Sequence, residues 1–310
     1  MSSSTAKSRE ALVRQLRSVT NATQADAQRL LKTHSYKLDR AVDAFFTDET
    51  AMTNAAKAAG GGGADKKQEK ESREKLGRMF DEFKDDDGTD ITIEGAMEMC
   101  EALSISPEDV VMLPLSFYLK SPSLGTFRRD DYIAGWRTIA DGQPCEDAEA
   151  QKRLLPRLRQ ELEQDAPVRG ERASEAKGGL FARTYEFTYT FARPEGQKSL
   201  PLESAVAFWD LVLPHSPTFQ GNGTPDRKGT FTPRQLRLWK KFLAEKGGNR
   251  AISKDTWTLF LDFTKEIDEE FKTHDFDAAW PSQIDDFVEW AKEQPASAGQ
   301  EEEDAMDESQ

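Results

Sequence analysis

Apolar residues recur along most of this chain with the 3.6-residue period of an amphipathic α-helix. The clearest stripe occupies positions i, i+3, i+4, i+7 and i+8, which are Leu38, Ala41, Val42, Phe45 and Phe46. Two shorter stripes precede it: Leu12, Val13 and Leu16, then Ala27, Leu30 and Leu31. Helices this short are stable only when they pool their apolar faces. Residues 8–50 are therefore predicted to form a compact three-helix bundle.

Residues 73–293 carry a longer series of helical stripes. An early stripe and a late one illustrate the pattern: Leu76, Met79, Phe80 and Phe83, then Trp257, Phe260, Leu261 and Thr264. Strand signals are limited to Ile91-Thr92-Ile93 and Gly125-Thr126-Phe127, which are short enough to form one bridging pair. The predicted fold class is all-α, with a multi-helix domain after the small bundle and at most a minor strand pair.

Two segments have the composition of chain that does not pack into a core. Residues 51–72 contain four consecutive glycines, Gly60 to Gly63, followed by a charged stretch, and are predicted to be a flexible linker. Residues 294–310 include Glu301-Glu302-Glu303-Asp304 and few apolar side chains. We expect this second segment to be an acidic disordered tail.

Charge and composition narrow the classes of partner. The formal net charge is −14, which argues against nucleic acid, since a phosphate backbone needs a basic face, and favours a basic protein partner. No apolar run approaches the roughly 20 residues that span a bilayer, and Met1 to Thr5 lack the apolar core of a signal peptide. We therefore expect an intracellular protein, cytoplasmic and/or nuclear, without a membrane partner.

One acidic stretch, Asp85 to Asp90, resembles a calcium loop between two helices. A calcium-binding loop of this type needs oxygen ligands at positions 1, 3 and 5, glycine at 6 and glutamate at 12. Placing Gly88 at position 6 puts Phe83 at position 1, and a frame that begins at Asp85 puts Ala96 at position 12. The pattern therefore predicts an EF-hand-like helix pair without calcium.

Other chemistry-bearing patterns are sparse. The two cysteines, Cys100 and Cys145, form no C-x-x-C pair, and the three histidines do not have zinc-ligand spacing. Neither a phosphate loop nor a nucleophile motif occurs. The sequence predicts no catalytic residue, no metal site and no cofactor.

Several motifs in residues 75–293 resemble the defective-in-cullin-neddylation proteins, in matching order and spacing. They are Phe191-Ala192-Arg193, Gly196-Gln197-Lys198, Trp209 to Leu213, Ile252 to Trp257, Leu261-Asp262-Phe263, Ala279-Trp280-Pro281 and Ile284 to Trp290. The matching region is that family's PONY domain, expected here over residues 73–293. The N-terminal bundle is similar to the ubiquitin-associated (UBA) domain that precedes it in some members.

The resemblance implies a non-catalytic ligase scaffold that brings the neddylation conjugating enzyme to the cullin C-terminal domain. It implies a cullin-binding patch at Asp255, Ala279 and Asp285. It also implies an apolar pocket for the acetylated N-terminal methionine of the conjugating enzyme, at Ile93, Met112, Leu115, Phe127, Phe191, Phe208 and Leu211. The family also implies a catalytic ring-type subunit as a partner.

The N-terminal bundle departs from the UBA pattern at one loop, where Ser18-Val19-Thr20 replaces the usual Met-Gly-aromatic sequence. If the bundle binds ubiquitin, Val19, Thr20 and Phe46 are the expected contacts. The alternative function is a ubiquitin-binding helical adaptor whose larger domain binds a partner other than a cullin.

Overall fold

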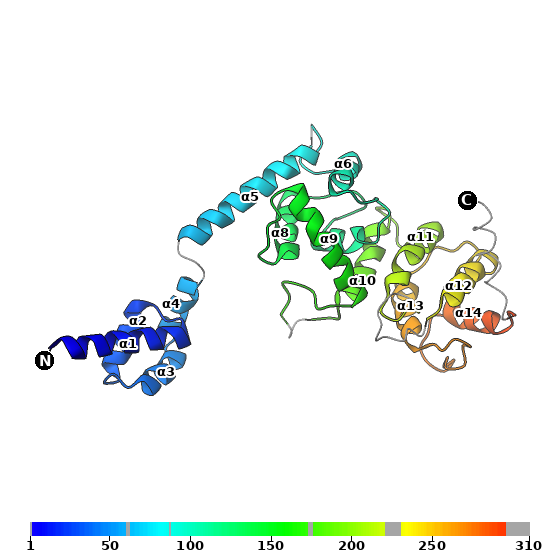
Figure 1. Ribbon diagram of the computed structural model, residues 1–310. Coiled ribbons are helices and arrows are strands. Elements are labelled where there is room, and N and C mark those ends of the chain that lie inside the picture. The colour runs from blue at the N-terminus through cyan, green and yellow to red at the C-terminus, as the bar shows by residue number, and fades with distance from the viewer. Residues whose placement is uncertain (1, 60–62, 87, 173–175, 221–230, 296–310) are drawn as a thin grey trace. The chain divides into compact units, whose positions relative to one another are not determined.

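The computed structural model describes residues 2–59, 63–86, 88–172, 176–220 and 231–295. Within these ranges the chain forms fourteen α-helices and one 3₁₀-helix, with isolated bridges and no β-strand (Figure 1). The prediction of an all-α fold is confirmed. Contacts divide the chain into two compact units, Met1–Glu74 and Lys75–Gln310, and each is described by itself.

Three helices of the N-terminal unit form the predicted bundle: α1 (Ser2–Thr20), α2 (Gln24–Thr33) and α3 (Leu38–Thr47). Their core includes Leu16, Leu31 and Phe45, which are at most 4% exposed. A fourth helix, α4 (Glu49–Ala59), adds Ala51 and Ala55 to the same core. The packed unit thus extends past residue 50, because these two small side chains let α4 approach the bundle closely.

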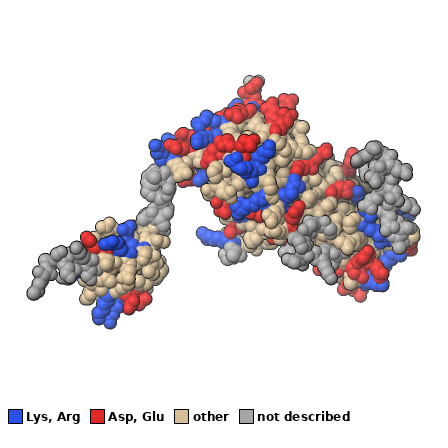
Figure 2. All heavy atoms as spheres, in the orientation of Figure 1, with Lys and Arg blue, Asp and Glu red and all other residues tan. Residues whose placement is uncertain are grey.

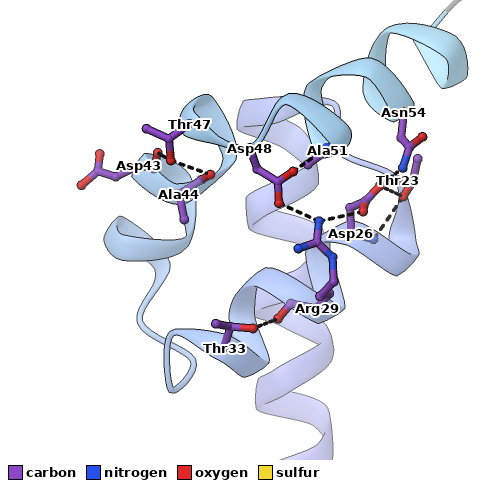
Figure 3. Close-up of polar contacts among 10 residues, drawn as sticks. All are labelled: Thr23, Asp26, Arg29, Thr33, Asp43, Ala44, Thr47, Asp48, Ala51 and Asn54. Carbon is purple, nitrogen blue, oxygen red and sulfur yellow. Dashed lines mark hydrogen bonds and ion pairs between the residues drawn. The ribbon is translucent and has the colours of Figure 1, made fainter.

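A polar network fastens α4 and the end of α3 to α2 (Figure 3). Thr23 caps α2 by accepting a hydrogen bond from the Asp26 amide, and the Asp26 carboxylate accepts hydrogen bonds from Thr23, Arg29 and Asn54 of α4. Arg29 also pairs with Asp48 at 2.8 Å. The hydrogen bond from Thr23 contributes most to holding the pKa of Asp26 below its usual value. Burial of this carboxylate is tolerated because all of its partners favour the charged form.

The segment predicted to be a flexible linker, residues 51–72, is largely helical. Helix α4 covers its beginning, and α5 (Gly63–Phe83) covers its end, while residues 60–62 lie outside the described residues. Alanine and the charged residues that follow the glycines favour helix, which explains the difference from a structureless segment. Its role as a linker between the two units stays a prediction.

The first half of the larger unit is a set of short helices around the predicted strand pair. These are the end of α5, α6 (Ile93–Leu103), α7 (Met112–Tyr118), α8 (Arg129–Ala140) and α9 (Ala148–Glu163). Ile91 and Phe127 form an antiparallel bridge, as the sequence predicted. Gly95 allows α5 and α6 to meet, because a Cβ there would lie 1.7 Å from the Phe83 carbonyl oxygen.

The calcium-like loop is organised by protein groups. The Lys84 ammonium donates to the backbone oxygens of Asp85 and Gly88, at 3.2 and 3.4 Å, and Thr92 donates to the Asp85 carboxylate at 2.9 Å. A fixed cation at these oxygens opposes the binding of a metal cation. The EF-hand-like helix pair is thus joined by protein contacts among the described residues, and the absence of calcium stays a prediction.

The second half of the larger unit is built on an aromatic core. Its elements are α10 (Leu180–Ala192), α11 (Leu202–Val212), η1 (Leu213–His215), α12 (Pro233–Glu245), α13 (Lys254–Glu266) and α14 (Ser282–Lys292). Trp209 stacks on Trp257, with ring centroids 5.0 Å apart. The Tyr185 hydroxyl accepts a hydrogen bond from Trp209 and donates one to the Trp257 carbonyl. Three helices are thereby joined at one buried point.

The predicted acidic tail, residues 294–310, falls almost entirely outside the described residues, which end at 295. On the visible face of the larger unit, acidic and basic side chains are intermixed (Figure 2). Because distant charges are screened by salt, the attraction of a charged partner to such a surface depends on nearby side chains more than on the net charge of the protein.

Candidate functional site

An apolar pocket of about 640 Å³ lies between α6, α7, α10, α11 and the loop before α8. Its floor includes Phe127 and Phe191, which are at most 5% exposed. Glu108 and Asp210 supply acidic groups to its lining, and Asp210 is paired with Lys240 of α12 at 2.9 Å. A cavity of this size with an apolar lining and few polar groups is suited to a small apolar ligand or the end of a peptide.

Six of the seven predicted pocket residues line this cavity: Ile93, Met112, Phe127, Phe191, Phe208 and Leu211. The seventh, Leu115, is fully buried and does not line it. Its helical position turns it toward the core, whereas Met112 and Ser116 of the same helix face the cavity. Leu115 is therefore a core residue and not a pocket residue.

The structure adds pocket residues that the sequence reasoning missed. Among them are Met97 and Cys100 of α6, Leu113 of α7 and Ala207 of α11. The spacing of Ile93, Met97 and Cys100, at i, i+4 and i+7, was the available signal, because it puts all three on one helix face. Burial raises the pKa of the Cys100 thiol, so it stays protonated and is a poor nucleophile.

Several of the exposed large apolar side chains lie at the candidate sites. In the described part of the chain there are seven: Val19, Phe46, Met52, Ile93, Met97, Leu124 and Phe276. Ile93, Met97 and Leu124 line the pocket, and Ile93 is 63% exposed. Clustered exposure of this kind marks surfaces that bind partners.

The predicted cullin-binding residues all reach the surface near the two C-terminal helices. Asp255 is exposed in the first turn of α13, and Asp285 is half-buried in the first turn of α14. Ala279 is exposed in the turn before α14. The amino end of a helix favours both carboxylates in their charged form.

His274 links Asp285 to the turn that carries Ala279, whereas Asp255 lies farther along α13. His274 bonds Asp285 at 2.8 Å, and its ring lies 5.9 Å from that of Trp280, the residue after Ala279. Phe263 of α13 also contacts His274, with ring centroids 5.8 Å apart. Asp255 is eight residues before Phe263, which is roughly 12 Å along the helix at 1.5 Å per residue. No described hydrogen bond or ion pair joins Asp255 to the other two positions, so the grouping of all three into one face stays a prediction.

The predicted ubiquitin contacts differ in accessibility. Val19 is 62% exposed and Phe46 is 58% exposed, but Thr20 is only 7% exposed. The Thr20 hydroxyl donates to the Leu16 carbonyl and accepts from the Ala22 amide, so it closes the end of α1. Val19, at the end of α1, and Phe46, on α3, are exposed and available to a partner, whereas Thr20 holds the end of α1 in place.

The described ranges hold neither a metal-ligand cluster nor a membrane-spanning helix. No group of three or more metal-ligating side chains occurs there. No described helix is long and apolar enough to cross a membrane.

Comparison with known proteins identifies both units. A family model for cullin binding matches residues 150–290, and a model of a UBA-like domain matches residues 10–51. The protein named defective in cullin neddylation protein 1 from Mycosarcoma maydis is 51% identical over 322 residues, covering 96% of this chain and 98% of that protein. The chain belongs to the defective-in-cullin-neddylation family.

Two more distant relatives with the same name extend the comparison. The protein from Cryptococcus neoformans is 35% identical and covers 91% of this chain and 94% of its own length. The protein from Candida albicans is 28% identical, with coverage of 91% and 97%. Members of this family act as non-catalytic scaffolds in neddylation.

Proposed function

We propose that this protein promotes cullin neddylation by holding the neddylation conjugating enzyme and the cullin C-terminal domain on one helical body. The observation that carries the proposal is the near-full-length likeness to a defective-in-cullin-neddylation protein, together with the apolar pocket at the predicted positions. The cullin-binding domain is matched over residues 150–290. A catalytic ring-type subunit completes the proposed assembly.

The pocket is proposed to bind the acetylated N-terminal methionine of the conjugating enzyme. Its aromatic floor and exposed apolar rim suit a flexible thioether side chain. A free amino terminus is charged, and its burial in this lining would cost several kcal/mol, whereas an acetylated one is neutral and needs only hydrogen bonds. Acetylation is therefore the feature that makes this end of the enzyme compatible with the site.

Asp255, Ala279 and Asp285 are proposed to form one face that binds a basic surface of the cullin. Asp255 and Asp285 offer charge-assisted acceptors to lysine or arginine. Ala279 has no side chain beyond Cβ, so it permits close approach of the partner at that point. The intracellular compartment, cytoplasmic and/or nuclear, stays a prediction.

The rate gain is proposed to come from proximity. Two modest contacts on one body raise the effective concentration of the charged conjugating enzyme at the cullin lysine, to the order of millimolar for a short connection. Correct orientation lowers the barrier further without acid–base chemistry by this protein. The scaffold itself contributes no group that reacts.

The proposal is tested in a purified transfer assay with a cullin C-terminal domain. Asp255→Lys combined with Asp285→Lys is expected to abolish both cullin binding and stimulation of cullin modification. The variant should stay folded, with a lower thermal unfolding midpoint because His274 loses its partner Asp285. Asp286→Lys, an exposed neighbour outside the proposed face, is the matched control and should retain stimulation. Stimulation that survives the double reversal would contradict the proposal and favour the adaptor with a partner other than a cullin.

The pocket is tested separately with Leu211→Arg, which places a charge in the apolar lining. Binding of an acetylated N-terminal peptide of the conjugating enzyme should fall at least ten-fold, because the arginine must be desolvated or must block the cavity. Cullin binding should be unaffected. Unchanged peptide affinity would assign the pocket to a different ligand, and loss of both activities would indicate misfolding.

A further inference from the structure

His274 is a buried histidine at the surface that contains the proposed cullin-binding residues. Its side chain is only 1% exposed, although the residue as a whole is half-buried, so the exposed part is backbone. The turn that carries it is fixed by Asp268, whose carboxylate accepts hydrogen bonds from the Lys272 and Thr273 amides. Phe271, in the left-handed region at φ 59°, packs edge-on against Phe287. The position of His274 is thereby set by the fold.

Three aromatic rings surround the imidazole. Phe276 meets it at a centroid distance of 4.6 Å, Phe263 at 5.8 Å and Trp280 at 5.9 Å. A ring enclosed in this way has little rotational freedom, since side chains in a packed interior occupy one rotamer. The direction of its polar edge is therefore fixed.

That polar edge points at Asp285. The Nε2 atom of His274 lies 2.8 Å from Oδ1 of Asp285, whose side chain is 28% exposed. Among the described residues, no hydrogen bond or ion pair involves the second carboxylate oxygen, Oδ2. One oxygen is thus held from within, and the other is available to an external donor.

We propose that His274 is a positioning residue for cullin recognition, which donates from Nε2 to Asp285 and fixes the carboxylate with Oδ2 toward the partner. The inference rests on the proposed function, because it concerns the face assigned to the cullin. An aspartate on a helix surface otherwise samples several rotamers, and fixing one of them on binding costs free energy. Because the buried imidazole fixes the Asp285 rotamer when the protein folds, this free-energy cost does not arise on binding. The partner then meets an acceptor that is already oriented.

The first experiment compares two substitutions in the full-length chain. His274→Phe keeps an aromatic ring in the enclosure but removes the donor. We expect the affinity for a cullin C-terminal domain to fall about three- to ten-fold, because the Asp285 side chain must then be immobilised on binding. His274→Gln restores an N–H donor and should recover part of the loss. Binding is measured by calorimetry, with thermal unfolding of each variant as the check on folding.

A matched control is available within the same unit. His215 pairs with Glu163 through Nδ1 at 2.9 Å, with both side chains about one-quarter exposed. His215→Phe removes the same kind of histidine–carboxylate contact away from the α13–α14 face. It should leave cullin affinity within two-fold of the natural protein.

A double-mutant comparison with Asp285→Asn separates failure of this inference from failure of the proposed function. If the inference holds, His274→Phe has less than a two-fold effect in the Asp285→Asn background. If Asp285→Asn alone leaves cullin affinity unchanged, the assigned face is wrong. If Asp285→Asn weakens cullin binding, but His274→Phe leaves the affinity unchanged or raises it, only the positioning role is overturned.

Nitrogen-15 NMR of the histidine side chains provides a readout that loss of packing alone would not imitate. The chain has three histidines, so assignment by substitution is direct. We expect the spectrum to show a hydrogen on Nε2 of His274. The nitrogen-15 chemical shift of this atom should change in the Asp285→Asn variant, and also when the cullin domain binds to the natural protein. A His274 signal that ignores both changes would refute the proposal.

Discussion

Replacement of Tyr185 by phenylalanine tests the buried junction that joins α10, α11 and α13. The Tyr185 hydroxyl accepts from the Trp209 indole nitrogen at 2.9 Å and donates to the Trp257 carbonyl at 2.8 Å. All three side chains are fully buried. Removing the oxygen leaves the Trp209 N–H, which can only donate, without a partner in a region that water does not reach.

The expected loss in the free energy of unfolding is about 2 kcal/mol. An unsatisfied buried donor costs about 1–3 kcal/mol, and the gain from no longer burying the hydroxyl offsets part of this. Tyr189→Phe is the matched control. Its hydroxyl donates to the Ile252 carbonyl at 3.1 Å, and that carbonyl also accepts from the Leu200 amide. No partner is stranded there, so the loss should be about 1 kcal/mol or less.

Urea unfolding followed by tryptophan fluorescence is the appropriate assay. All six tryptophans belong to the larger unit, so the signal reports that unit without a contribution from the N-terminal bundle. The midpoint should fall while the denaturant dependence stays constant, which separates a change in stability from a change in the surface exposed. A loss for Tyr185→Phe no larger than that for Tyr189→Phe would refute the reasoning.

Two further predictions concern alkaline pH and a helix contact. Burial raises the pKa of both the Cys145 thiol and the Tyr132 hydroxyl to about 12. Their contribution to the free energy of unfolding is therefore complete below about pH 9. It is lost as pH rises toward 12, because these groups ionise first in the unfolded chain. The urea midpoint should fall across that window, and less steeply in Cys145→Ala. Gly95→Ala should destabilise the larger unit by about 3 kcal/mol through overpacking against the Phe83 carbonyl. Gly142→Ala, where nothing lies within 4 Å, should cost about 1–2 kcal/mol, from its positive φ alone.

The helical fold was predictable because its apolar periodicity is regular, and the bridge between Ile91 and Phe127 followed from two short β-type runs. The pocket was predictable in outline from the family resemblance. Leu115 was misplaced because the resemblance gives no direction for a side chain on a short helix that is buried on several faces. Helix α4 was missed because alanine-rich sequence beside glycines has the composition of a linker, and only its neighbours show that it packs.

The contact between His274 and Asp285 lay beyond sequence reasoning for a different reason. The two residues are eleven positions apart and belong to a turn and the following helix. No periodic pattern relates a turn to a helix that follows it. The pairing depends on the path of the chain around Phe271, where the backbone adopts φ 59°, and this conformation has no reliable signature in a phenylalanine.

Packing of helix α4 restricts which residues can occupy a stretch of chain whose composition resembles that of a variable linker. Ala51 and Ala55 are at most 5% exposed against the N-terminal core, so bulkier side chains at these two positions would push the helix away from α3. Asn54 would then lose its 3.1 Å hydrogen bond to Asp26. We therefore expect side-chain volume at positions 51 and 55 to be restricted among related proteins that retain this helix, while the outward positions of α4 vary.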